Sequence, residues 1–284
     1  MITFVVLHYN NLNVTKECVN TLLKLENFNN SAVVVVDNKS PNNSGCELVR
    51  EFHLNNNVHI VLNNENLGFA QGNNIGYSYA KEKLLSDIII VMNNDVFIKQ
   101  KGFIAALEEQ SKKYDILGPK ITNRLGQNQN PFRTNLVTNK KVFYLYLYNK
   151  LTSVILNVPV INYGYLIMID KLKKNKIKSE ASFTGLQDLV LHGSCVIYTK
   201  NWIQKENFAF VPETFMYFEE DFLAEYAKER GYKVGYTENI EVIHLEDASV
   251  DSTFVGNLSK KKFISKNMSD SVYKFLKFRK CGKY

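Results

Sequence analysis

The strongest constraint on the fold is a run of five apolar residues, Ile88 to Met92, that ends abruptly in Asn93, Asn94 and Asp95. Such a run is typical of a strand covered on both faces, because a half-exposed strand would alternate apolar and polar residues. Strands of this kind belong to α/β sheets, whose ligands collect at the strand carboxyl ends. Asp95 is therefore predicted at a ligand-binding strand end, although the same polar residues would equally suit the cap of a following helix.

The first hundred residues alternate strands with helical stretches. Strands are predicted at residues 4–9, 32–36, 58–62 and 88–92, and helices at 14–25 and 46–52. A Gly/Asn-rich loop over residues 63–77 is expected to run into a third helix toward Leu84. Strands separated by helices indicate a parallel, nucleotide-binding sheet.

The composition fits a folded enzyme-sized chain. With 284 residues, of which 45% are hydrophobic and 22% charged, the chain can bury a sizeable core. The four cysteines are scattered, so neither a zinc site nor a disulfide framework is indicated. Met1 runs directly into an apolar strand with no basic segment before it, which does not fit a signal peptide. We therefore expect a reducing, cytoplasmic location.

The net charge of +7 is concentrated at the carboxyl end. Ser259 to Tyr284 holds eight Lys and one Arg against the single acid Asp270. Aromatic residues alternate with these lysines, a mixture that suits an anionic membrane surface. A solvated, partly disordered tail is the alternative, whereas nucleic-acid binding is disfavoured because no recognition motif accompanies the charge.

The middle of the chain is apolar but does not predict a transmembrane helix. Residues 142–169 contain many large apolar side chains and no acid, yet polar residues interrupt them before about 20 apolar residues accumulate. A helix over residues 141–158 would be apolar around much of its circumference, and five lysines follow at 171–178. It is either an interfacial membrane element or an ordinary buried helix.

Two polar segments in the later third are candidates for chemistry. A turn of His192, Gly193 and Ser194 precedes a predicted strand, and glycine would let a ligand approach the backbone closely. Three consecutive acids, at residues 219–221, precede a helix over residues 224–230 that Gly231 ends. Acids favour a helix start, but three crowded carboxylates also raise one another's proton affinity, so that one can serve as a general base.

Three motifs in order resemble the family 2 inverting glycosyltransferases with the GT-A fold, in particular bacterial enzymes that build capsule, O-antigen or rhamnan chains. The resemblance covers about residues 2–250. It rests on Val6-Leu7-His8-Tyr9-Asn10 at the first strand, Val36-Asp37-Asn38-Lys39-Ser40 at the second, and Asn66-Leu67-Gly68-Phe69-Ala70-Gln71-Gly72-Asn73-Asn74-Ile75-Gly76.

The resemblance implies a site for a nucleoside-diphosphate sugar, in which Asp37 recognises the base. The residues it assigns to this site are Tyr9, Asn10, Asp37, Asn38, Gly68, Phe69, Asn73, Asn93, Asn94, His192, Gly193 and Glu219.

The resemblance also implies the metal and the base. Asp95 would be the metal-binding end of a DxD-type motif that departs from the pattern at Asn93, and would hold Mg²⁺ or Mn²⁺. His244 stands where related enzymes have a histidine near the metal or diphosphate, although a lone histidine is more often structural. Glu220 would be the general base, with Asp221 as competitor because a one-residue shift would exchange them.

The function expected from this resemblance is transfer of a sugar from dTDP-rhamnose or a UDP-hexose to a lipid-linked oligosaccharide, at the cytoplasmic face of the membrane. The expected layout is a glycosyltransferase domain over residues 1–250, with a nucleotide-sugar half at 1–98 and an acceptor half at 99–250 that contains a variable insert at about 125–182. Residues 251–284 form the basic tail. The alternatives are a sugar-nucleotide nucleotidyltransferase, which would release pyrophosphate, and a non-catalytic nucleotide-sugar binder.

Overall fold

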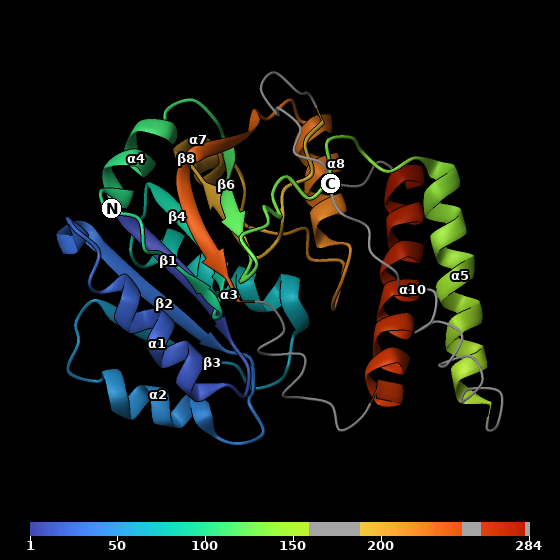
Figure 1. Ribbon diagram of the computed structural model, residues 1–284, viewed down its shortest axis with the longest axis horizontal. Coiled ribbons are helices and arrows are strands. Elements are labelled where there is room, and N and C mark those ends of the chain that lie inside the picture. The colour runs from blue at the N-terminus through green and yellow to red at the C-terminus, as the bar shows by residue number, and fades with distance from the viewer. Residues whose placement is uncertain (159–187, 246–256, 282–284) are drawn as a thin grey trace.

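The computed structural model describes residues 1–158, 188–245 and 257–281, which contain one eight-stranded mixed sheet with helices on both faces (Figure 1). The strand order is β3-β2-β1-β4-β7-β6-β8-β5. Three segments for which the sequence made predictions lie outside the described residues. They are the apolar residues after 158, the lysine-rich stretch 171–178, and residues 246–256, which span the predicted boundary between the domain and its tail.

The amino-terminal half is the predicted parallel sheet. Its strands pair in parallel in the order β3-β2-β1-β4. They are β1 (Ile2–His8), β2 (Ser31–Asp37), β3 (Val58–Leu62) and β4 (Ile88–Asn93). Both faces are covered, because α1 (Leu12–Leu22) and α2 (Ser44–Phe52) pack on one face and α3 (Gly68–Glu82) packs on the other. The prediction of a doubly covered β4 is confirmed, since Ile89, Ile90 and Val91 are fully buried.

The Gly/Asn-rich stretch differs from its prediction as a loop. Helix α3 begins at Gly68, so two thirds of the stretch, residues 68–77, is helical. The reason is that its glycines permit close packing within a helix: a Cβ on Gly76 would lie 2.4 Å from Val5 Cγ1, and one on Gly72 would lie 2.9 Å from Leu7 Cδ1. Glycine here lets a helix approach β1 closely, whereas the composition alone favours a loop.

The second half of the sheet is mainly antiparallel. It contains β5 (Val96–Phe97), β6 (Ile116–Thr122), β7 (Cys195–Tyr198) and β8 (Val234–His244), with α4 (Phe103–Gln110), α7 (Lys200–Lys205) and α8 (Glu219–Glu229) around it. Strand β7 runs antiparallel to β4, and β5 runs antiparallel to β8. These pairings bring the start of β7 and the end of β8 to the carboxyl end of β4.

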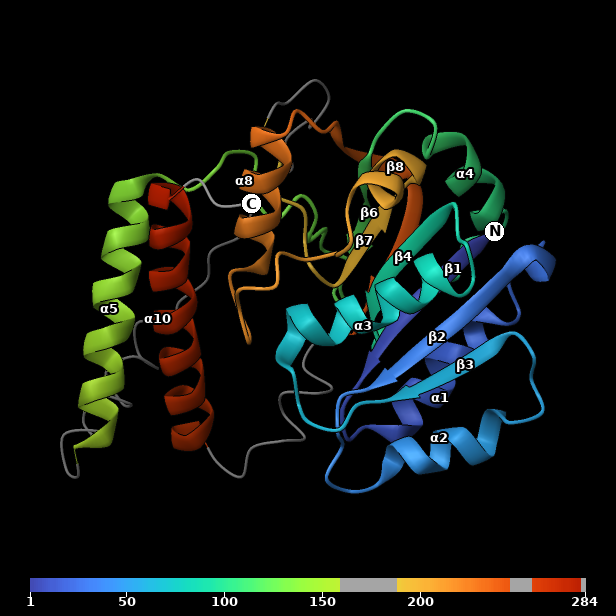
Figure 2. The same ribbon diagram turned by 180° about the vertical axis from the view of Figure 1, so that it is seen from behind.

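Two long helices form a pair at the side of the sheet domain (Figures 1 and 2). They are α5 (Asn139–Asn157), close to the predicted helix, and α10 (Asn257–Cys281). The helices run antiparallel, because Arg279 near the end of α10 donates to Asn139 at the start of α5. None of the described helices is long and apolar enough to span a bilayer.

Helix α10 is part of the core. Phe275 is fully buried, and its ring centroid lies 5.1 Å from that of Phe218 and 4.9 Å from that of Phe222. Val272 and Phe278 are buried beside it. The alternative of a solvated tail is therefore wrong for residues 257–281, because their apolar side chains pack against the segment that leads into α8.

This packing gives a stability prediction. Phe275→Ala should lower the free energy of unfolding by about 3–5 kcal/mol, because it removes a fully buried ring and leaves a cavity. Urea denaturation followed by circular dichroism measures the change. Leu54→Ala, at a side chain that is 83% exposed, serves as the control and should change stability by less than about 0.5 kcal/mol. Equal stability of Phe275→Ala and wild type would mean that α10 is not docked in solution.

Candidate active site

The end of β4 carries a buried carboxylate with an unused oxygen. Asp95 is only 3% exposed, and its Oδ1 has no hydrogen-bond partner. The β5–β8 register pairs Val96 with His244, which brings His244 Nε2 to 3.4 Å from Asp95 Oδ1. The pairing of β5 with β8 thus brings Asp95 and His244 close together. Two side chains that bind the same metal ion must lie close together in this way.

The second ring nitrogen of His244 has its own partner. Nδ1 lies 2.9 Å from Oε1 of Gln129, so a proton on Nδ1 would be donated to that oxygen. The lone pair of Nε2 then faces Asp95. A second hydrogen bond that fixes the ring tautomer is usual for histidine ligands, and one carboxylate with one imidazole suits a divalent ion that also binds a diphosphate. Within the described ranges, no cluster of three or more metal-binding side chains occurs.

A turn connects this strand end to the acids. The backbone N–H of Asn93 donates to Ser194 O (2.9 Å), and the His192 ring lies 5.6 Å from the His244 ring. Gly193 N–H donates to Glu220 Oε1 at 3.3 Å, and a Cβ on Gly193 would lie 2.8 Å from the same oxygen. A side chain at this position would displace the Glu220 carboxylate from the Gly193 N–H.

The three consecutive acids have different environments. They form the first turn of α8, which begins at Glu219 rather than at the predicted Ala224. Glu219 is buried and accepts a hydrogen bond from Thr214 (2.8 Å), and Asp221 is buried in an ion pair with Arg133. Glu220 alone is half-buried. Of the three residues, Glu220 is the most exposed.

Burial raises the proton affinity of all three acids. Burial and the neighbouring charge of Glu220 raise the pKa of Glu219 to about 8. Burial raises the pKa of Asp221 to about 7, although Arg133 opposes the rise. Burial also raises the pKa of Glu220, and hydrogen bonds and the Arg133 charge lower it. Groups with raised pKa values accept protons near neutral pH, as a general base must.

The backbone ahead of the acids is strained. Tyr217 and Phe218 have φ angles of 72° and 76°, and such left-handed conformations cost about 1–3 kcal/mol each for residues other than glycine. Helix α10 holds this segment, because Phe275 packs on Phe218 and Ser271 Oγ donates to Met216 O at 2.9 Å. The acids are thus held in place by a distant part of the sequence.

The predicted base-recognition residues lie at the ends of β1 and β2. Asp37 is buried and accepts a hydrogen bond from the Ser40 hydroxyl, while Ser40 Oγ accepts from the backbone N–H of Asn10 at 2.9 Å. Asn10 Oδ1 is buried without a partner. Tyr9 is half-buried beside them. An unsatisfied buried acceptor is rare and indicates a ligand or a water at this position.

Several predicted sugar-nucleotide residues make contacts within the fold. Asn38 uses both ends of its amide, donating to Gly68 O (2.9 Å) and accepting from Leu67 N (3.0 Å). Asn94 donates to Thr15 Oγ1 (2.8 Å) and is 3% exposed. In this structure, Asn38 and Asn94 fasten the loops around the site.

Gly68, Phe69 and Asn73 lie where α3 meets the segment before α8. Phe69 N–H donates to Phe215 O (2.6 Å), and a Cβ on Gly68 would lie 2.0 Å from that oxygen. Asn73 is buried and donates to Phe69 O, but its Oδ1 has no partner. These residues tie the nucleotide half of the domain to the segment that carries the acids.

Three residues near the site were not predicted. Arg133 pairs with Asp221, Gln129 binds His244, and Asn130 accepts from the backbone of His192 at 3.0 Å. They lie at the start of the predicted variable insert. The asparagines, glutamines and arginine there do not recur at the spacing of a helix or a strand, so the sequence gives no indication of where they point. The only signal was the density of hydrogen-bonding side chains in residues 127–133, which does not reveal their partners.

Known proteins share both sequence and fold with this chain. The sequence model described as Glycosyl transferase family 2 matches residues 3–172. The low-salt glycan biosynthesis hexosyltransferase Agl10 of Haloferax volcanii is 31% identical over 94 residues, which are 33% of this chain and 29% of that protein. The matched region is thus less than a third of that relative's length.

Solved structures with low sequence identity share the architecture. S. aureus TarS residues 1–349 in complex with UDP-GlcNAc has a TM-score of 0.54 and 14% identity, covering 89% of this chain and 61% of that one. GalNAc-T7 with UDP, GalNAc and Mn²⁺ has a TM-score of 0.57 and 13% identity, covering 97% of this chain and 47% of that one. At such identity the likeness shows the fold alone, which is the predicted GT-A α/β fold.

The buried acids predict how stability depends on pH. The folded-state pKa of Glu219, about 8, lies above the ordinary value of 4.5, so the folded protein binds a proton that the unfolded chain loses. Stability should therefore fall as pH rises from about 4.5 to about 8. Glu219→Gln keeps the oxygen that Thr214 contacts and removes the titration. Its urea midpoint should match wild type at low pH and exceed it above pH 8; identical profiles would contradict the burial of this charge.

Proposed function

Since the chain belongs to glycosyl transferase family 2, we propose that it is an inverting enzyme of bacterial surface polysaccharide synthesis. It transfers a sugar from a nucleoside-diphosphate sugar to a hydroxyl of a lipid-linked saccharide. The observation that carries this proposal is the presence of two carboxylates near the turn at Gly193: Asp95, which has a buried oxygen without a hydrogen-bond partner, and Glu220, which is the most exposed of the three consecutive acids and accepts from Gly193 N–H.

The donor is proposed to be a UDP-hexose or dTDP-rhamnose. The UDP-linked donor is favoured by the similar structures, because TarS was solved with UDP-GlcNAc and GalNAc-T7 with UDP. The nucleotide base would lie against Asp37. The unpartnered Oδ1 of Asn10 would accept a hydrogen bond from an N–H or O–H group of the sugar nucleotide. The diphosphate would then extend toward the end of β4, as ligands of open α/β sheets do.

Asp95 and His244 are proposed to hold Mg²⁺ or Mn²⁺. The fit rests on the unpartnered Asp95 Oδ1 and on His244 Nε2, whose ring is oriented by Gln129. GalNAc-T7, which shares the fold, was solved with Mn²⁺. The ion would supply Lewis-acid stabilisation of the charge on the departing diphosphate.

Glu220 is proposed to remove the proton of the acceptor hydroxyl as that oxygen attacks the anomeric carbon. The new bond forms on the face opposite the leaving nucleoside diphosphate, so the anomeric configuration inverts without a covalent sugar–enzyme intermediate. Asp221 is less suited to this role because Arg133 already binds it and it is buried. Gly193 N–H orients the Glu220 carboxylate through Oε1.

A donor screen tests the proposal. Protein, Mn²⁺ and a lipid-linked acceptor are incubated with dTDP-rhamnose or a series of UDP-hexoses, and the released nucleotide is identified. Transfer releases a nucleoside diphosphate, whereas release of pyrophosphate would identify a nucleotidyltransferase and overturn the proposal. Asp95→Ala should abolish metal-dependent release, and the exposed-acid variant Glu108→Ala should retain it; turnover at the wild-type rate by Asp95→Ala would reject the metal assignment.

The choice of base gives a second prediction. Glu220→Gln should lower kcat by about 10²- to 10⁴-fold while leaving the donor Kd unchanged, because it removes proton transfer and not donor contacts. Steady-state kinetics and donor titration separate the two effects. Asp221→Asn should retain more activity than Glu220→Gln; the reverse order would move the base by one residue.

Arg133 gives a prediction for the pH profile. The Arg133 charge lowers the pKa of both Glu220 and Asp221, so Arg133→Gln should raise them. Because the base must be unprotonated, the acid limb of kcat/KM should move to higher pH. The position of this limb does not depend on how much of the protein is active. The control is Arg124→Gln, which changes an exposed arginine nine positions earlier and should leave the acid limb at its wild-type pH. An unshifted acid limb for Arg133→Gln would mean that Arg133 only supports the fold.

A further inference from the structure

Helix α5 exposes an apolar side. Four residues, each between 43% and 61% exposed, recur at spacings of four, four and three and therefore share one face: Phe143, Leu147, Leu151 and Val154. Tyr144 and Tyr148 lie beside them and are also exposed. Together these six residues form what we call the α5 outer face.

The inner side of α5 is apolar as well. Val142 and Leu156 are buried there, and Leu145 and Tyr146 are half-buried against the core. A surface helix of a water-soluble domain normally has a single apolar stripe that faces inward, so a second apolar stripe on the exposed side of α5 has no role in the fold of the described residues. Single exposed apolar residues need no explanation, but a contiguous apolar face marks an interaction site. Each side chain of the α5 outer face is at least 42% exposed.

The charge around this face is predominantly positive. Helix α5 contains Lys140, Lys141 and Lys150 and no acid. Helix α10 contains seven Lys and one Arg against Asp270 alone. The two helices together hold ten more positive than negative charges, which exceeds the net +7 of the whole chain. The positive charge of the molecule is therefore collected on the helix pair that carries the exposed apolar face.

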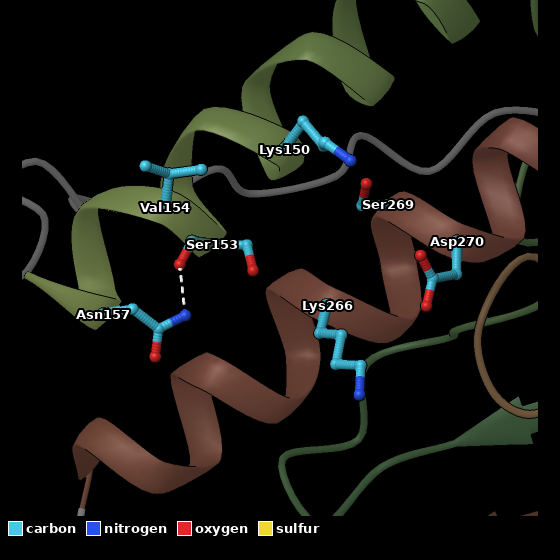
Figure 3. Close-up of a pocket in the computed structure, with 7 residues that line it drawn as sticks. All are labelled: Lys150, Ser153, Val154, Asn157, Lys266, Ser269 and Asp270. Atoms are coloured by element: carbon cyan, nitrogen blue, oxygen red, sulfur yellow. Dashed lines mark hydrogen bonds between the residues drawn. The ribbon is translucent and has the colours of Figure 1, made fainter.

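A groove of about 450 Å³ runs along the seam between the two helices (Figure 3). Lys150 and Val154 line it from α5, and Lys266, Ser269 and Asp270 line it from α10. Further along α10, Tyr273 is 45% exposed, its ring lies beside Tyr146 of α5, and Lys277 lies over it. Lysines and tyrosines thus border the apolar face on its α10 side.

We propose that the α5 outer face lies on an anionic phospholipid bilayer, with its apolar side chains among the acyl chains and the lysines of α5 and α10 at the headgroups.

Charge complementarity favours a bilayer over a second copy of this chain. Two copies joined through α5 would bring lysines against lysines, and neither of the two α5 helices contains an acid to offset them. An anionic headgroup layer neutralises these charges instead, at about 1 kcal/mol per lysine. Tyrosines at the edge of an apolar face are typical of the membrane interface. This inference does not depend on sugar transfer, because binding can be measured without donor or acceptor.

Flotation with vesicles tests this proposal. The full chain is mixed with phosphatidylcholine vesicles that contain or lack phosphatidylglycerol. It should float with the anionic vesicles only, and added salt should weaken the binding. Phe143→Gln/Leu147→Gln/Leu151→Gln should lose flotation, and Lys150→Gln should lower the partition coefficient about fivefold. The matched control Leu54→Gln/Leu125→Gln, at two leucines exposed elsewhere, should float like wild type.

Three results would overturn the proposal. They are no flotation of the wild type on anionic vesicles, equal flotation on neutral vesicles, and unchanged flotation of the triple α5 variant. Sedimentation in the absence of lipid tests the competing occupant: a wild-type dimer that the triple variant converts to a monomer would assign the face to a second copy. Thermal melting of each variant shows that a lost interaction does not reflect unfolding.

Discussion

The site depends on the pairing of β4 with β7 and of β5 with β8, which are the last two strands in the sequence. Residues 93–95, 192–194 and 244 are far apart in sequence, and antiparallel pairing brings them to one strand end. Each pairing is fixed by backbone hydrogen bonds, such as Asn93 N to Ser194 O and Leu245 N to Asp95 O. Because a one-residue slip would turn every side chain to the opposite face, the register itself sets the partnership of Asp95 and His244.

The acids depend on a second support that the sheet does not provide. The segment before α8 is strained at Tyr217 and Phe218, and α10 presses on it through Phe275. Strained backbone persists where surrounding packing over-determines it and is concentrated at functional sites. The helix pair that is proposed to meet the bilayer is thus also the one that holds the proposed base. Membrane contact and catalysis would share a structural element, although each is tested separately.

The sequence predicted elements that local pattern determines. Buried strands, the helix at α5, the strand end at Asp95 and the cluster of acids at residues 219–221 follow from periodicity and composition. The choice of Glu220 as the base and of His244 as a metal ligand came instead from the resemblance to family 2 glycosyltransferases. The sequence did not predict that α10 packs against the segment before α8. A mixture of lysines and aromatic residues is compatible both with a solvated tail and with a half-buried helix. Nor did the sequence reveal Arg133 or Gln129, whose partners lie more than eighty residues away. Such contacts arise from tertiary structure alone.

The central claim is a division of labour, with Asp95 and His244 serving the leaving group and Glu220 serving the acceptor. A crystal of the protein grown with Mn²⁺ and UDP tests it most directly, because anomalous scattering locates the manganese independently of any assumed ligand. The account predicts a peak bound by Asp95 Oδ1 and His244 Nε2, with Glu220 free of metal. A peak on the carboxylates of residues 219–221 would contradict it.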